Sequence, residues 1–75
     1  MSTLVHVNIP KGFYLGQIRL RGHRLWETVT NPHDKPEPAM AGAVLKMTPE
    51  HKRARVIFVD DSGWYEPHQV MECTR

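Results

Sequence analysis

Arginine side chains are the residues whose types and spacing most clearly indicate a chemistry, the binding of anions. They form two groups, one in the first third of the chain and one beyond its middle. If the segments that carry the two groups are neighbours in a sheet, they make one basic face that neutralises phosphates. With Tyr14, Trp26 or Tyr65 nearby, the face also offers a ring on which an unpaired base can stack. The predicted nucleic-acid-binding residues are Arg19, Arg21, Arg24, Arg53 and Arg55.

The charge of the chain is distributed unevenly along the sequence. Residues 11–55 hold nine Lys or Arg against four acids, a net charge of +5, whereas residues 56–75 hold four acids and one Arg, a net charge of −3. This asymmetry indicates either an anion-binding face or opposite charges on neighbouring strands. In the second case the arginines pair across strands and each pair stabilises by roughly a few tenths of a kcal/mol. The acids available for such pairs are Glu27, Asp60, Asp61 and Glu66.

Histidine is frequent, with five residues in the chain, yet their spacing does not predict a metal site. No two of them are an i, i+4 pair on a predicted helix, and Cys73 is the sole cysteine. Zinc needs three or four convergent donors. The spacing leaves open a site assembled from the distant His51, His68 and Cys73. We expect no metal and no cofactor.

Acid–base pairs of the kind that a small ribonuclease requires can be drawn between His23 and Glu27, or between Glu66 and His68. In a β-strand, where side chains alternate between the two faces, both members of each pair would lie on the same face. Alternating polar residues on the wet face of any antiparallel strand give the same pattern. We therefore predict no catalytic residues and expect a binding module rather than an enzyme, with a ribonuclease as the third alternative.

Trp64 and Tyr65 form an aromatic pair beside Glu66, which suits a protein contact because Trp and Tyr dominate interface hot spots. The alternative to a nucleic-acid partner is therefore an adaptor or host-takeover protein. It would bind a bacterial or phage protein through this pair, or form a homodimer through a free strand edge. A chain with only six aromatic residues also needs some of them inside, so Phe58 and one Trp are expected in the core.

The elements that must position these residues follow from hydrophobic periodicity and from proline and glycine. Leu15, Gln17 and Arg19 alternate with Ile18 and Leu20, which predicts a half-buried strand over residues 13–21. A turn at Gly22 and His23 returns the chain into a strand over residues 24–30. The predicted elements are a tail strand within residues 1–12, strands 13–21 and 24–30, a proline-rich loop 31–38, a helix from Pro38 to before Pro49, a central strand 56–59, and a last strand 64–73 interrupted at Pro67.

The predicted helix carries Met40, Ala43, Val44 and Met47 at the spacing of an apolar stripe, so it should cover one face of the sheet. This arrangement predicts an α+β fold, a small antiparallel sheet with one helix on one face, in the order β-β-β-α-β-β. A chain of 75 residues has room for a single domain over 1–75, with 1–12 a loosely attached tail. No apolar run is long enough to span a membrane, and one cysteine permits no internal disulfide, so we expect a soluble protein of the bacterial cytoplasm with no membrane partner.

Two stretches, His51–Phe58 and Trp64–Cys73, resemble small uncharacterised proteins encoded by bacteriophages and prophages. The resemblance covers residues 16–75 and implies a phage accessory protein, without implying an activity. The order hairpin, helix, strand is also similar to double-stranded-RNA-binding and arm-type DNA-binding domains. The basic helix N-terminus of the former is replaced here by Glu37 and two prolines. Together these observations predict a non-enzymatic module that binds nucleic acid through a basic sheet face.

Overall fold

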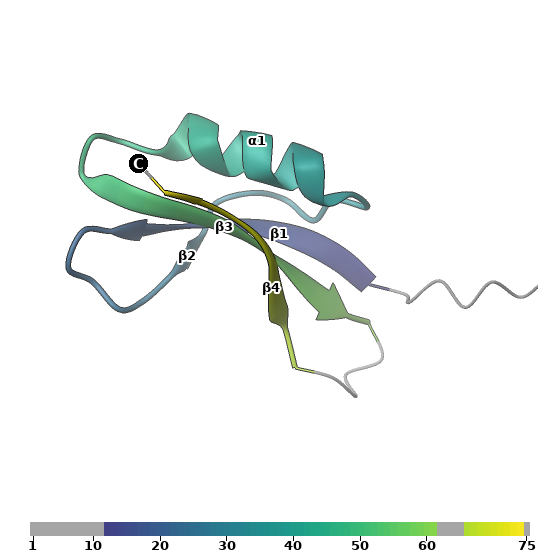
Figure 1. Ribbon diagram of the computed structural model, residues 1–75. Helices are drawn as coiled ribbons and strands as arrows, with labels where there is room; N and C mark the ends of the chain where they lie inside the picture. Colours follow the sequence, from purple (N-terminus) through teal and green to yellow (C-terminus); the bar gives the residue numbers. More distant parts are fainter. Residues whose placement is uncertain (1–11, 62–65, 75) are drawn as a thin grey trace, which may run out of the picture.

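The computed structural model describes residues 12–61 and 66–74. Within these ranges the chain forms one antiparallel sheet and one helix (Figure 1). The elements are β1 (Gly12–Leu20), β2 (Glu27–Thr28), α1 (Pro36–Lys46), β3 (His51–Asp60) and β4 (His68–Thr74). The predicted α+β fold is therefore confirmed. The predicted tail strand lies outside the described residues except for Gly12, which begins β1.

The sheet has the strand order β2-β1-β3-β4, so the two long strands are central and the two short ones are at the edges. β1 and β3 pair along their whole length, with Gly16 opposite Val56 and Arg19 opposite Arg53. Residues opposite each other share a face of the sheet, and successive residues alternate between faces. The even-numbered residues 16, 18, 54 and 56 therefore face one way, and the odd-numbered residues 17, 19, 53 and 55 face the other.

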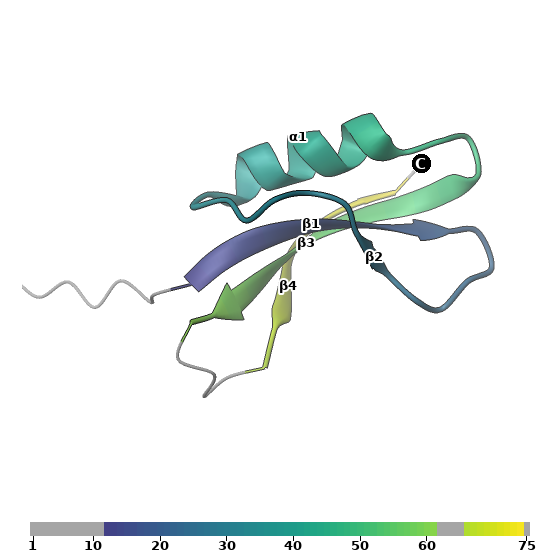
Figure 2. The same ribbon diagram turned by 180° about the vertical axis from the view of Figure 1, so that it is seen from behind.

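Helix α1 covers the even-numbered face (Figures 1 and 2). Its Ala39 and Ala43 are fully buried, and Ala43 packs with Ile18 and Ala54 in the core. Met40 and Met47 are partly buried and pack against this cluster, as their spacing predicts. Val44 is an exception to the predicted stripe, because its side chain is 37% exposed. The contact face of the helix is thus narrow and built from small residues.

Helix α1 begins at Pro36, two residues before the predicted start at Pro38. Lys35 precedes Pro36 in an extended conformation. Proline at the first helical position loses no hydrogen bond, and Pro36 meets this condition as well as Pro38 does. The helix ends at Lys46, where the Met47 N–H donates to the Val44 carbonyl and the chain becomes extended before Pro49. No helix in the described ranges is long and apolar enough to cross a membrane.

The predicted return strand 24–30 is shorter than expected, since only Glu27 and Thr28 are in strand conformation. A turn with Gly22 at φ 79° closes through the His23 N–H and the Leu20 carbonyl, and residues up to 26 then form a loop. Beyond β2 the chain still follows the edge of β1. The Val29 N–H donates to the Gly16 carbonyl, and Tyr14 and His33 exchange both backbone hydrogen bonds.

The expected core aromatic residues are not in the centre of the core. The space between helix and sheet is lined by Gly16, Ala39, Ala43 and Ala54, and this close approach leaves no volume for a large ring. Phe58 is half-buried, with its ring centroid 5.0 Å from that of Tyr14 and 5.8 Å from that of His68. Trp26 is half-buried on the sheet face opposite the helix, and Trp64 lies outside the described residues.

Candidate nucleic-acid interface

Three of the five predicted arginines converge on the sheet face that α1 does not cover. Arg19 of β1 lies directly opposite Arg53 of β3, and Arg55 follows two residues along β3 on the same face. Like charges placed opposite each other in a sheet are destabilising. We call the surface formed by Arg19, Arg53 and Arg55 the arginine face.

Trp26 organises two of these side chains. The guanidinium carbon of Arg55 lies 4.3 Å from the centroid of the Trp26 ring, and that of Arg19 lies 4.9 Å from it. Guanidinium groups favour the electron-rich face of an indole, and such a contact stabilises by about 0.5–1 kcal/mol at an exposed site. The ring therefore contacts two cations, one from each of the two central strands.

Gln17, directly opposite Arg55 on the neighbouring strand, holds its guanidinium in position. Its side chain is buried, accepts a hydrogen bond of 2.8 Å from Arg55 Nε at Oε1, and donates one of 3.0 Å from Nε2 to Thr28 Oγ1. Burial lowers the pKa of the Arg55 guanidinium, the charge of Arg19 lowers that pKa further, and Glu72 acts in the opposite direction. Arginine still stays protonated at neutral pH, so the face keeps its charge.

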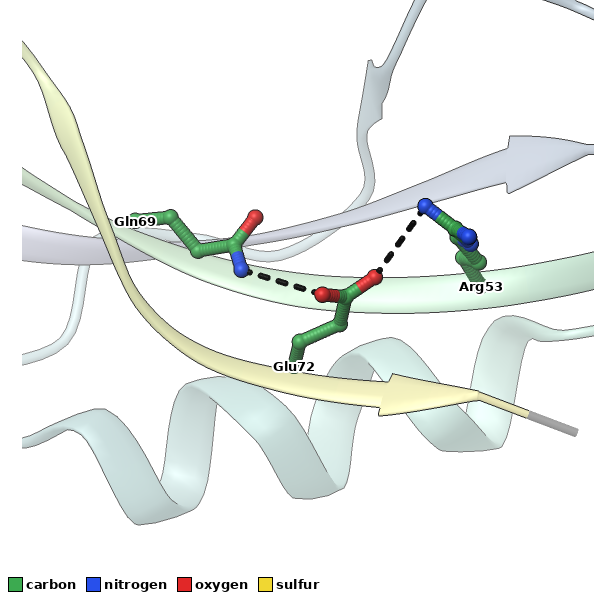
Figure 3. A network of polar contacts seen from close by, with 3 residues as sticks. All are labelled: Arg53, Gln69 and Glu72. Atoms are coloured by element: carbon green, nitrogen blue, oxygen red, sulfur yellow. Dashed lines mark hydrogen bonds and ion pairs between the residues drawn. The ribbon is translucent and has the colours of Figure 1, made fainter.

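Glu72 of β4 is the carboxylate that approaches the arginine face (Figure 3). Its Oε2 lies 3.6 Å from Arg53 Nη1, and the two side chains are 33% and 44% exposed. Its Oε1 accepts a hydrogen bond of 3.2 Å from Gln69 Nε2. An exposed ion pair of this length contributes at most about 1 kcal/mol. Between described residues, this is the only ion pair that partly neutralises the charge of the arginine face. The face therefore has three cations and one carboxylate close to them.

Arg21 and Arg24 lie outside the strands, so the register places neither of them on the arginine face, and their part in binding stays a prediction. Strand β1 ends at Leu20, so the alternation that would have placed Arg21 beside Arg19 stops one residue earlier. Both arginines are exposed in the loop between β1 and β2. Trp64 and Tyr65, the predicted protein-contact residues, lie outside the described residues.

The loop that carries Arg21 and Arg24 borders a surface hollow of about 320 Å³ at the β2 edge of the sheet. Its apolar walls are Ile18, Leu20, Leu25 and Trp26, and its polar residues are His23, Glu27 and His51. His23 and Glu27 both line this hollow, but not as the predicted pair on one strand face, because His23 lies in the turn before β2. Ile18, Leu20 and Glu27 lie on the helix side of the sheet, opposite the arginine face. Trp26, whose ring contacts Arg19 and Arg55, also lines the hollow, so the two surfaces meet at this edge of the sheet.

His51 reaches this hollow because the register of the sheet shifts beside it. Arg19 pairs with Arg53 but Leu20 pairs with His51, which leaves Lys52 without a partner on β1. A bulge of this kind reverses the alternation, so His51 shares the face of Leu20 rather than that of Arg53. Thr48 then holds the imidazole, since its N–H donates to His51 Nδ1 at 3.0 Å and its Oγ1 lies 2.8 Å from the same atom.

The arrangement left open by the sequence, a site of His51, His68 and Cys73, is not formed. His51 pairs with Leu20 near one end of β3, whereas His68 pairs with Phe58 near the other end. Within residues 12–61 and 66–74, no three His, Cys, Asp or Glu side chains are grouped so that they could hold a metal ion.

Comparison with protein-family models, with curated proteins and with solved structures finds no match for this chain. The site is therefore interpreted from its geometry. Sequence reasoning missed Gln17 as a member of the site, although it alternates in phase with Arg19. It also missed Glu72, because nothing local to the sequence places β4 beside the arginines.

Proposed function

We propose that this chain is a non-enzymatic module that binds nucleic acid through the arginine face. The observation that carries the proposal is the placement of Arg19 directly opposite Arg53, with Arg55 beside them and one exposed carboxylate in range. Such a face repels itself in the free protein. A phosphate backbone supplies the missing negative charge and gains entropy by releasing its counterions.

The side chains of the face also suit phosphate chemistry. Guanidinium groups donate up to five hydrogen bonds in a planar fork that matches two phosphate oxygens. Stacking on Trp26 and the Gln17 hydrogen bond restrain two of the three guanidiniums before a ligand arrives. Restraint of this kind lowers the entropy that binding would otherwise cost. The resemblance to phage proteins would make this a phage or prophage accessory protein, which is part of the proposal.

The test is a titration of the purified chain against a labelled single strand and a labelled duplex at two salt concentrations. We expect binding that weakens as salt rises, with a log–log slope of about −0.7 per phosphate contacted on a single strand. Replacing Arg19→Gln together with Arg53→Gln removes two of these contacts, so the slope should become shallower by about 1.4.

The matched control is Lys35→Gln together with Lys46→Gln, which removes the same charge from the two ends of α1, on the other side of the sheet. Net charge alone would affect both double variants equally. Equal losses in the two variants, or no binding at low salt, would overturn the proposal. Retention of one bacterial protein from a nuclease-treated lysate by a chain that binds no nucleic acid would favour the adaptor alternative.

A further inference from the structure

We infer that the hollow beside Trp26 is a pocket for one unpaired guanine base of a strand held on the arginine face. The inference rests on the proposed function and adds to it a ligand class and a site. It follows from the shape of the hollow, from the hydrogen-bonding groups in it and from its position at the sheet edge, where Trp26 contacts two of the arginines.

The size and walls of the hollow suit a single base. Its volume of about 320 Å³ is at the lower end of the range for small-ligand pockets, which begins at about 300 Å³. Ile18, Leu20, Leu25 and Trp26 give it apolar walls, against which the faces of a base can pack. Leu25 is 84% exposed, so its side chain is accessible to a ligand in the hollow. A base in the hollow would cover it.

The polar groups of the hollow select among the bases. Glu27 is exposed, and within the described ranges its carboxylate makes neither a hydrogen bond nor an ion pair. An ionised carboxylate only accepts hydrogen bonds. The Watson–Crick edge of guanine presents two adjacent donors, N1–H and the N2 amino group, whereas adenine and cytosine present an acceptor ring nitrogen that the carboxylate would repel. Thymine presents a single donor, N3–H, between two acceptor oxygens, so guanine alone offers the carboxylate two adjacent donors. Glu27 is therefore matched best to guanine.

His51 supplies the complementary donor. Because a backbone N–H can only donate, the Thr48 N–H makes His51 Nδ1 an acceptor. The neutral imidazole then carries its proton on Nε2, which leaves a donor for guanine O6. The bulge at Lys52 brings this histidine to the hollow. Donor and acceptor are thus provided by two different strands, β3 and β2.

The position of the hollow connects the base to its backbone. Trp26 lines the hollow, and the guanidiniums of Arg19 and Arg55 lie 4.9 and 4.3 Å from the centre of its ring. The hollow lies on the helix side of the sheet and the arginines on the other side, and the two meet at Trp26. A strand that passes over this edge can therefore place one base in the hollow and a neighbouring phosphate against the arginines. The base must be unpaired, because its Watson–Crick edge faces Glu27 and His51.

The experiment measures the affinity of the full chain for labelled oligothymidines of about ten nucleotides, a length within the site size of small single-strand binders. One strand contains only thymidine, one has a central guanine and one a central adenine. We expect the guanine strand to bind about tenfold more tightly than the other two, as for a bidentate base contact. Glu27→Gln should abolish this preference, so that the guanine strand binds no more tightly than plain oligothymidine.

Glu50→Gln is the matched control. Glu50 is also exposed but lines a neighbouring hollow with Arg21, so the same isosteric change there should preserve the guanine preference. Salt-dependent binding with equal affinity for all three strands, or binding to duplex alone, would overturn the guanine pocket and leave the proposed function standing. Absence of binding to every strand at low salt would overturn both. The comparison of strands uses the unaltered chain, so it does not depend on the folding of any variant.

Discussion

Replacing Gly16→Ala should destabilise the fold strongly, because Gly16 is the point of closest approach between β1 and α1. A Cβ built on Gly16 lies 2.4 Å from the backbone oxygen of Ala39, 2.7 Å from Thr30 Cγ2 and 3.0 Å from Ala43 Cβ. The first of these neighbours is helix backbone and cannot move alone. Ordinary contact begins at 3.4 Å, so the helix must move away from the sheet by about 1 Å, the difference between 3.4 and 2.4 Å.

The size of the effect follows from this displacement. A gap of 0.5–1 Å already removes roughly a quarter to a half of the dispersion attraction between the surfaces that it separates. The contacts at risk are those of Ala39, Ala43, Met40 and Met47. Overpacking of a well-packed site typically costs about 1–3 kcal/mol. A domain of this length has a total stability of only roughly 3–5 kcal/mol, so the variant should lose a large share of it.

Urea unfolding followed by far-ultraviolet circular dichroism measures the loss. With an m-value of about 1 kcal/mol/M, the midpoint should fall by about 1–3 M. Gly42→Ala is the comparison, because its Cβ would meet only Thr30 side-chain atoms, the nearest at 3.0 Å. Its gain in helix propensity, up to about 1 kcal/mol, offsets that contact. A Gly16→Ala midpoint within error of the unaltered protein would refute the packing of α1 on β1 described above.

Two further expectations concern Trp26 and Thr48. Trp26→Ala removes the ring on which two arginines stack and should weaken nucleic-acid binding about fivefold, whereas Trp26→Phe should retain most of the affinity. The titration at low salt measures both variants. An unchanged affinity of the alanine variant would exclude a role for stacking. Thr48→Ala removes the hydroxyl that lies 2.8 Å from His51 Nδ1 and accepts from the Glu50 N–H at 3.3 Å. Losing these exposed contacts should cost about 0.5–1 kcal/mol, a fall in Tm of roughly 2–8 °C by calorimetry, and Thr48→Ser should restore it.

Salt dependence and base preference report on different parts of this molecule, which makes the two proposals separable. Arg19, Arg53 and Arg55 act through charge, so their removal should affect every nucleic acid similarly. Glu27 and His51 act through the placement of hydrogen-bonding groups, so a change there should affect one base and leave the salt slope in place. Variants that change the arginines alone, the residues of the hollow alone, or both together would therefore assign each effect either to the arginine face or to the hollow.

The elements of this fold that sequence reasoning predicted well are those specified by local patterns. Leu15, Gln17 and Arg19 alternate with Ile18, and the structure confirms that the two sets face opposite sides of β1. Three prolines within residues 31–38 confine that stretch to loop and helix start. Hydrophobic alternation and proline constrain the backbone of residues close by in the chain. Their effect can therefore be predicted without knowing which elements pack against each other.

Local patterns gave less reliable positions where packing decided the outcome. The spacing of Val44 matched the apolar stripe, and Trp26 matched a core aromatic residue, yet both are turned away from the centre of the core. The reason is the narrow contact between α1 and the sheet, which Gly16, Ala39 and Ala43 permit and which excludes larger groups. Hydrophobicity predicts that a side chain is suited to burial, whereas the volume left between two elements decides whether it is buried.

By itself, the sequence determined that five arginines are available, that some of them share a strand face and that the chain forms an α+β domain. Only the tertiary structure decided that Arg19, Arg53 and Arg55 meet while Arg21 and Arg24 lie outside the strands, and that His51 shares a hollow with Glu27. The physical reason is register. The pairing of β1 with β3 joins residues such as Gln17 and Arg55, 38 positions apart, and a single bulged residue, Lys52, reverses which side chains share a face.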